Sequence, residues 1–322
     1  MPREVRREVE RVLRSRVARS ERVFGGYAPS ATFRMRLTNG RRAFFKASYP
    51  LPPESKVVFN IRQEERVYRA LSKRIAAWSP RFFGSFERDG WHVLLLEDVG
   101  PPTMPPWTVS RTHRAARSYA AFHRATIGTR LPPWMPRKTH TEFARFWSSL
   151  SRSGELARTA TLAGRRRAAA ERWIADALPR LRRGEAALQR VAPPFALLHF
   201  DTRSDNVRLL GERLVMFDWP FASVGPAEFD VAAFAQAVAA EGGPTPERVL
   251  KWYEDVLPLR PQAIDASIAG IAGYFADRAW RPPLPGLPRL RSIQRRQFKA
   301  SLPWAARRLG LREPDWINAV PD

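Results

Sequence analysis

Two short apolar runs that each end at a carboxylate constrain this chain more than any other feature. The first run, Phe195–Leu198, leads to Asp201, and Asn206 follows five residues later. The second run, Leu214–Phe217, ends directly at Asp218. Runs of this length predict buried strands, so these polar groups are expected at strand ends. One acid there can orient and deprotonate a hydroxyl, while an amide oxygen and a second acid hold Mg²⁺ against phosphates.

The complete pattern, His199-x-Asp201-x-x-x-x-Asn206 followed by Asp218, resembles the catalytic loop and metal-binding aspartate of the kinase-like fold. Either half alone is common, and each acid could simply cap a strand, but the two halves together are much more specific. The resemblance implies that Asp201 is the catalytic base and that Asn206 and Asp218 bind Mg²⁺. Arg203 would stabilise charge on the transferring phosphoryl group.

Neighbouring residues narrow the resemblance to the aminoglycoside phosphotransferase and choline kinase group. Asp218 is followed by Trp219-Pro220 rather than Phe-Gly, and Arg203 stands where protein kinases usually carry Lys. The resemblance implies an α+β, two-lobed protein kinase-like fold. A five-stranded antiparallel N-lobe would cover residues 1–98, and a mainly helical C-lobe with the catalytic loop and acceptor pocket would cover 99–322.

Local patterns agree with a five-stranded N-lobe. Residues 21–46 predict three strands, and residues 80–86 and 91–97 predict two more. Asn39-Gly40 and Asp89-Gly90 are tight-hairpin sequences, because both positions of such a turn favour residues that tolerate positive φ. The strands are therefore expected to pair as antiparallel hairpins.

Apolar residues at helical spacing predict most of the remaining elements. Helices are expected over 2–16, 54–78, 110–126, much of 140–190, and most of the chain from 225 to about 309. Two polar residues in these helices are expected to be structural. His123 is expected to be hydrogen-bonded near the catalytic loop, and the resemblance implies that Asp230 anchors that loop.

Lys46 is the candidate phosphate-binding cation. It closes an apolar strand, and an inward-facing lysine is costly unless it is paired or binds an anion. The resemblance implies that it contacts the nucleotide phosphates and pairs with a glutamate on the following helix. We favour Glu64, because it shares a helical face with Val67 and Leu71, and keep Glu65 as the alternative.

Two further segments would contact the nucleotide. A turn with adjacent glycines would let Gly26 bring its backbone close to phosphates, and Ser30 could add a hydroxyl donor. The segment with Glu97, Asp98 and Val99 matches the linker where the family binds adenine. Backbone groups would pair with the base there, while the two acids are either solvated or touch ribose.

Composition excludes some chemistry and leaves other questions open. There is no cysteine, so disulfides and thiolate sites are excluded, and a cytoplasmic location is expected. The chain carries 55 Lys and Arg against 31 Asp and Glu, a net charge of +24. The basic residues recur in nearly every segment, which favours solvated surfaces over a specific nucleic-acid site. In 140–190, arginines outnumber acids, which favours a neutral or partly anionic acceptor over a polycationic drug.

These patterns predict an ATP- and Mg²⁺-dependent phosphotransferase that phosphorylates a hydroxyl of a small molecule, either an antibiotic or a metabolite. Five residues near the end of one helix could line the acceptor site, although core packing is the favoured role for the aromatic ones: Tyr274, Phe275, Asp277, Arg278 and Trp280. A kinase-like nucleotide-binding regulatory protein and a basic nucleic-acid-binding protein are the alternatives. The sequence leaves open GTP as donor, the acceptor, and a monomer or a dimer.

Overall fold

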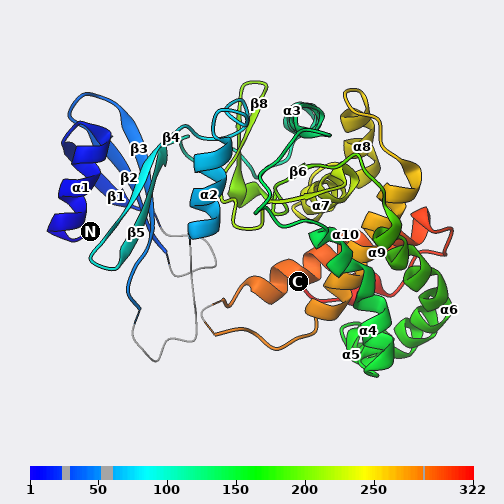
Figure 1. Ribbon diagram of the computed structural model, residues 1–322. Helices are drawn as coiled ribbons and strands as arrows, with labels where there is room; N and C mark the ends of the chain where they lie inside the picture. The colour runs from blue at the N-terminus through cyan, green and yellow to red at the C-terminus, as the bar shows by residue number, and fades with distance from the viewer. Residues whose placement is uncertain (24–29, 52–60, 286) are drawn as a thin grey trace. The chain divides into compact units, whose positions relative to one another are not determined.

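The computed structural model describes residues 1–23, 30–51, 61–285 and 287–322, and every structural statement below concerns these residues (Figure 1). The chain divides into two compact units. The first unit comprises Met1–Thr103 and Asp205–Ala222. The second unit comprises Met104–Ser204 and Ser223–Asp322.

The first unit is built on a five-stranded antiparallel sheet, which confirms the predicted number and pairing of strands. The strands are β1 (Val17–Arg22), β2 (Ala31–Leu37), β3 (Arg42–Ser48), β4 (Phe82–Arg88) and β5 (Trp91–Glu97), in the order β1-β2-β3-β5-β4. Both predicted hairpins are present. Asp89 and Gly90 both have positive φ, +50° and +73°, as a two-residue tight turn requires, whereas at Asn39-Gly40 only Gly40 does, at +82°.

Two helices cover opposite faces of this sheet (Figure 1). Helix α1 (Arg3–Leu13) buries Val5, Val9 and Leu13 in a core that also contains Phe45 of β3. Helix α2 (Arg62–Leu71) packs on the other face, where the Tyr68 and Phe82 rings stack at 5.9 Å. Because strand residues alternate between faces, β3 must aim Lys46 away from the α1 core and towards the α2 side.

The helix predicted over 54–78 is wrong at its C-terminal end, since α2 ends at Leu71. Residues 52–60 lie outside the described chain. Beyond Leu71 the backbone tightens into turns, and the Trp78 N–H donates to the Ile75 carbonyl at 2.8 Å. The Trp78 carbonyl in turn accepts the Met216 N–H at 2.7 Å. A tertiary contact far along the chain therefore replaces the continued helix.

A short hairpin completes the first unit. Strands β7 (Val207–Leu210) and β8 (Arg213–Met216) pair antiparallel, and the 3₁₀ turn η4 (Ser204–Asn206) leads into β7. Both strands are apolar and buried over most of their length, and β8 contains most of the second apolar run, as expected.

The second unit is mainly helical. Its helices are α3 (Val109–Thr126), α4 (Phe146–Arg152), α5 (Leu156–Thr161), α6 (Arg167–Ala186), α7 (Ala227–Ala240), α8 (Pro246–Glu254), α9 (Pro261–Arg278) and α10 (Leu290–Arg308). Short 3₁₀ turns are η1 (Thr139–Arg145), η2 (Gly164–Arg166), η3 (Ala187–Arg190) and η5 (Ile317–Ala319). Strands β6 (Ala196–Leu198) and β9 (Ser223–Gly225) form a two-stranded sheet.

Helix α9 is central to the second unit, since it packs against α4, α6, α7 and α10. It is apolar and buried on most sides, as is α7, so both act as core helices. Throughout the described chain, every helix is too short or too polar to cross a membrane.

Candidate functional site

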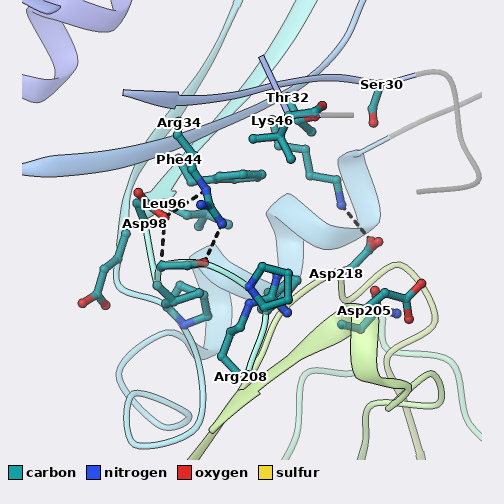
Figure 2. Close-up of a pocket in the computed structure, with 18 of the residues that line it drawn as sticks. Ser30, Thr32, Arg34, Phe44, Lys46, Leu96, Asp98, Asp205, Arg208 and Asp218 are labelled. Carbon is teal, nitrogen blue, oxygen red and sulfur yellow. Dashed lines mark hydrogen bonds and ion pairs between the residues drawn. The ribbon is translucent and has the colours of Figure 1, made fainter. Parts of the chain in front are cut away.

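A cavity of about 290 Å³ opens on the α2 side of the sheet in the first unit (Figure 2). The sequence-predicted residues that line it are Ser30, Lys46, Glu64, Glu97, Asp98, Val99, Asn206 and Asp218. Gly26 lies outside the described residues. Ordinary ligand pockets measure roughly 300–1,000 Å³, so this cavity has the size of a small-ligand site.

Strand alternation aims the side chains of the sheet into this cavity. In β3, Phe45 joins the core under α1, whereas its neighbours Phe44 and Lys46 line the cavity. Across β2 and β3, Thr32 is paired with Lys46. Arg34 is likewise paired with Phe44, so β2 and β3 present Thr32, Arg34 and Lys46 on one face together with the Phe44 ring.

Lys46 is held between two carboxylates. Its Nζ donates to Glu64 Oε2 and to Asp218 Oδ1, each at 2.7 Å, and Lys46 is only 8% exposed. Burial lowers the pKa of Lys46, but the nearby carboxylates outweigh this effect and raise it above its ordinary value. The lysine therefore keeps its positive charge inside the cavity, where it can meet an anionic ligand.

Glu65 has other partners than Lys46. It accepts from Arg69 Nε at 2.7 Å and from Ser85 Oγ at 2.5 Å, and it lies 2.6 Å from His92 Nε2. The helical geometry explains the difference, because consecutive residues point about 100° apart. Of the two candidates, Glu64 is the one that the structure pairs with Lys46.

The open end of the β7–β8 hairpin presents oxygen atoms to the same cavity. Asn206 precedes β7 and Asp218 follows β8, and the Phe217 N–H donates to the Asn206 carbonyl at 3.0 Å. Asp218 has a φ of +67°, a strained conformation that is often found at functional sites. Amide and carboxylate oxygens with phosphate oxygens form the ligand set that Mg²⁺ prefers. These two residues therefore fit a magnesium site.

The segment after β5 closes the other end of the cavity. The Asp98 carboxylate accepts from Arg42 Nη2 at 2.9 Å and from the Gly100 N–H at 3.0 Å, and its side chain is 3% exposed. Glu97 Oε2 accepts the Arg81 N–H at 3.1 Å. Both acids thus accept hydrogen bonds within the protein, and these bonds help to hold the backbone of the segment.

Sequence reasoning missed two arginines that line this end. Arg34 Nη2 donates to the Gly100 carbonyl at 2.6 Å. Figure 2 shows Arg34 and Arg208 among the residues that line the cavity. Arg208 is 8% exposed, and its guanidinium lies 4.9 Å from the centre of the Phe217 ring. Burial lowers the pKa of Arg208, and the charge of Arg34 lowers it further. The position of Arg208 two residues after Asn206 was a local signal, but only the register of β2 on β3 and the β7–β8 pairing bring both arginines to this cavity.

Asp201 and Arg203, the predicted catalytic residues, lie in the second unit and pair with each other. Arg203 Nε donates to Asp201 Oδ1 at 2.7 Å, and Arg203 Nη2 lies 3.3 Å from Asp201 Oδ2. The Asp201 side chain is 25% exposed, so a ligand can reach it. The arginine therefore provides a positive charge directly beside the predicted base.

Buried hydrogen bonds hold the loop that carries Asp201. Asp230, at the start of α7, accepts the backbone N–H groups of His199 and Phe200 at 2.7 and 2.9 Å. His123 Nε2 lies 3.3 Å from Asp230, and His123 Nδ1 lies 2.7 Å from the Tyr253 hydroxyl. Phe200 has a φ of +72°, so the loop needs such support to keep its conformation.

Comparisons with known proteins agree with this description. A model of the phosphotransferase enzyme family matches residues 21–264. A spectinomycin phosphotransferase, solved with ADP and spectinomycin, is similar at a TM-score of 0.58 and 11% identity, covering 98% of this chain and 97% of its own. No curated protein sequence matches the chain.

Two further solved structures are similar over most of their length. An aminoglycoside phosphotransferase of Alicyclobacillus acidocaldarius has a TM-score of 0.59 and 17% identity, with 93% of this chain and 95% of that chain covered. A choline kinase of Streptococcus pneumoniae has a TM-score of 0.53 and 13% identity, with 95% and 98% covered. These likenesses confirm the predicted kinase-like α+β fold.

Proposed function

We propose that the chain, which belongs to the phosphotransferase enzyme family, transfers the terminal phosphoryl group of ATP to a hydroxyl group of a small molecule. The observation that carries the proposal is the cavity in which Lys46 bridges Glu64 and Asp218 beside Asn206. A buried cation next to oxygen ligands for Mg²⁺ is what a bound triphosphate requires.

In this proposal Lys46 contacts the ATP phosphates and Glu64 keeps the lysine in place. Asn206 and Asp218 hold Mg²⁺, which neutralises phosphate charge when it is bound. The backbone of Glu97–Val99 pairs with the base, and Ser30 adds a hydroxyl donor beside the phosphates. Residues 1–98 act as the nucleotide lobe.

Residues 99–322 supply the catalytic loop and the acceptor pocket in this proposal. Asp201 accepts a hydrogen bond from the acceptor hydroxyl and takes its proton as the new O–P bond forms. Arg203 stabilises negative charge on the transferring group, and its ion pair with Asp201 holds it at that position. Because ATP is the donor, we also propose a cytoplasmic location. The relatives act on spectinomycin or choline, which supports a small hydroxyl-bearing acceptor.

The same substitution at two carboxylates tests this assignment. Asp201→Asn should retain Mg²⁺-dependent ATP binding and lose about 10²- to 10⁴-fold in turnover, the usual contribution of a general base. Asp218→Asn should instead weaken Mg²⁺–ATP binding itself. Calorimetry with Mg²⁺–ATP and ADP release in a broad acceptor screen measure the two effects.

Three other outcomes would contradict parts of this assignment. Near-normal turnover by Asp201→Asn would remove Asp201 as the base, and unchanged Mg²⁺–ATP affinity of Asp218→Asn would remove Asp218 from the metal site. ATP binding and slow hydrolysis without any acceptor, in a broad screen of metabolites and antibiotics, would favour a regulatory nucleotide-binding protein.

A further inference from the structure

Three arginines gather where α9 ends and α10 begins, in the second unit. Arg278 Nε and Arg281 Nη2 lie 3.2 and 2.7 Å from the two carboxylate oxygens of Asp277. Arg291, in the first turn of α10, donates from Nε to the Pro282 carbonyl at 2.9 Å, and its Nη1 lies 3.4 Å from the Arg278 carbonyl. The loop between the two helices therefore holds three guanidinium groups beside one carboxylate. We call Arg278, Arg281 and Arg291 the arginine cluster.

The positive charge of the arginine cluster is only partly compensated. Arg291 is 5% exposed, whereas the side chains of Arg278 and Arg281 are 37% and 33% exposed. Burial lowers the pKa of Arg291, and the charges of Arg278 and Arg281 lower it further, while Asp277 opposes them. Glu155 acts on Arg281 as well, so Arg281 is the best compensated of the three. Arg291 donates within the protein to Pro282, Arg278 and Gln294. Arg278, the most exposed of the three, is therefore left with the greatest need for an anion.

Aromatic contacts connect the arginine cluster to the loop that carries the catalytic base. The Phe200 and Phe143 rings lie 5.6 Å apart, and the Phe143 and Tyr274 rings 5.2 Å apart. The Arg278 guanidinium lies 5.6 Å from the centre of the Tyr274 ring. Burial raises the pKa of Tyr274. The charge of Arg278 lowers this pKa, and the charge of Asp201 raises it. Tyr274 thus lies within electrostatic reach of both the cluster and the base.

We propose that the acceptor carries an oxyanion, either a carboxylate or a phosphate, which Arg278 binds while its hydroxyl meets Asp201. This inference rests on the phosphotransferase function proposed above. The bond between the terminal phosphorus and the bridging oxygen of ATP breaks, ADP leaves, and the acceptor oxygen forms the new bond. The hydroxyl proton passes to Asp201. Charge-assisted, bidentate hydrogen bonds from arginine would fix the acceptor so that one hydroxyl faces the base.

The same charges disfavour a polycationic acceptor. A ligand ammonium group placed beside Arg278 would be repelled, because like charges in a partly buried site are poorly screened. Asp277 cannot compensate such a ligand, since both of its oxygens already accept hydrogen bonds or ion pairs from Arg278 and Arg281. The competing explanation is that the arginines only brace the α9–α10 loop through carbonyl groups.

Matched acceptors separate these explanations. The first series shares one sugar ring and differs in charge: glucose, glucuronate, glucose 6-phosphate and glucosamine. The second series shares one three-carbon backbone and differs in charge in the same way: glycerol, glycerate and glycerol 3-phosphate. With Mg²⁺–ATP, we expect turnover or calorimetric binding for carboxylate or phosphate members, and none for glucosamine. Comparing the carboxylates with the phosphates identifies which oxyanion is preferred.

Substitutions then assign the effect to Arg278. Arg278→Gln should raise KM for the anionic compound, or its Kd without ATP, about 10- to 100-fold, as loss of a charge-assisted hydrogen bond predicts. KM for Mg²⁺–ATP should stay unchanged, and Arg278→Lys should recover part of the loss. Arg167→Gln is the matched control, because Arg167 pairs with Glu171 on the exposed surface of α6 of the same unit.

Three results would overturn the inference. The first is phosphorylation of neutral or amino members with no response to anionic ones, while Mg²⁺–ATP still binds. The second is anion binding that Arg278→Gln leaves unchanged while it lowers Tm, which would show a bracing role only. The third is an Arg278-dependent affinity for DNA without any small-anion binding. Failure of the wild-type protein to bind Mg²⁺–ATP would instead overturn the proposed function, and this inference with it.

Discussion

Lys46 keeps a charge in a buried position because two carboxylates accept its hydrogen bonds. Glu64 is 1% exposed and holds the lysine from α2, whereas Asp218 holds it from the end of the hairpin. A buried charge that loses one partner is left partly uncompensated, and this costs more than the lost hydrogen bond alone. The position of the lysine Nζ therefore depends on both acids.

Neighbouring glutamates on α2 offer a matched test at the residue scale. Glu64→Gln should weaken Mg²⁺–ATP binding by about 10-fold or more, because the hydrogen bonds of a charged group contribute about 1.5–3 kcal/mol. Glu65→Gln should leave ATP affinity unchanged and lower Tm, since Glu65 bonds Arg69, Ser85 and His92. Calorimetry and thermal unfolding measure the two effects. Equal losses of ATP affinity in both variants would contradict the assignment.

His140 makes the stability of the protein depend on pH. It is 1% exposed, and burial together with the charge of Lys138 lowers the pKa of His140 to about 4. The unfolded chain, with a histidine pKa of about 6.5, therefore takes up the proton first as the pH falls. Stability is present above pH ~6.5 and is lost progressively towards pH ~4.

Unfolding experiments can isolate this contribution. Between about pH 7.5 and about pH 5, wild type should lose about 2 kcal/mol more stability than His140→Leu, which cannot titrate there. Urea unfolding of both proteins at the two pH values gives the difference, so that all other titrating groups cancel. A parallel decline of the two proteins would show that His140 is not the group responsible.

At the scale of elements, the loop that carries Asp201 depends on the first turn of α7. Asp230 is fully buried and joins two backbone N–H groups of the loop to His123 of α3. Burial raises the pKa of Asp230, but the hydrogen bond and charge of His123, together with a hydrogen bond from Tyr119 and the charge of His199, outweigh this and lower it below its ordinary value. The carboxylate is therefore ionised when it holds the loop.

Replacing this carboxylate should affect turnover through the loop. Asp230→Asn loses part of the acceptor capacity for two N–H groups, so we expect a stability loss of about 1–3 kcal/mol and a lower kcat. KM for Mg²⁺–ATP should change little. Asp265→Asn is the control, since Asp265 pairs with Arg308 in the same unit and is one-third exposed. A normal kcat in Asp230→Asn would show that the loop keeps its geometry without this support.

Elements with local signals were predictable from sequence, and those fixed by distant contacts were not. The hairpins at Gly40 and Gly90 follow from turn residues that tolerate positive φ. The end of α2 depends instead on the Trp78 carbonyl, which bonds β8. Arg34 and Arg208 were missed for the same reason, because only the register of β2 and the β7–β8 hairpin brings them to one cavity.

At the scale of the whole molecule, the net charge of +24 should dominate nonspecific association. A duplex of mixed sequence should bind at about 20 mM salt and dissociate by about 150 mM, because binding of this kind releases counterions. Exchanging the sequence should have no effect. Fluorescence anisotropy across a salt series measures both. Affinity that survives physiological salt and maps to one face would favour a nucleic-acid-binding role.

The ribosome synthesises the last segment of the first unit long after its sheet, and this affects how the unit folds. Its sheet is complete by Thr103, yet Asn206 and Asp218 belong to the segment Asp205–Ala222. At translation rates of about 5–20 residues per second, the ribosome needs roughly 5–20 seconds to make the intervening hundred residues. During that interval ATP in the cell cannot stabilise the emerging sheet through the proposed magnesium ligands. The nascent sheet must therefore rely on its own α1 core until the hairpin leaves the exit tunnel.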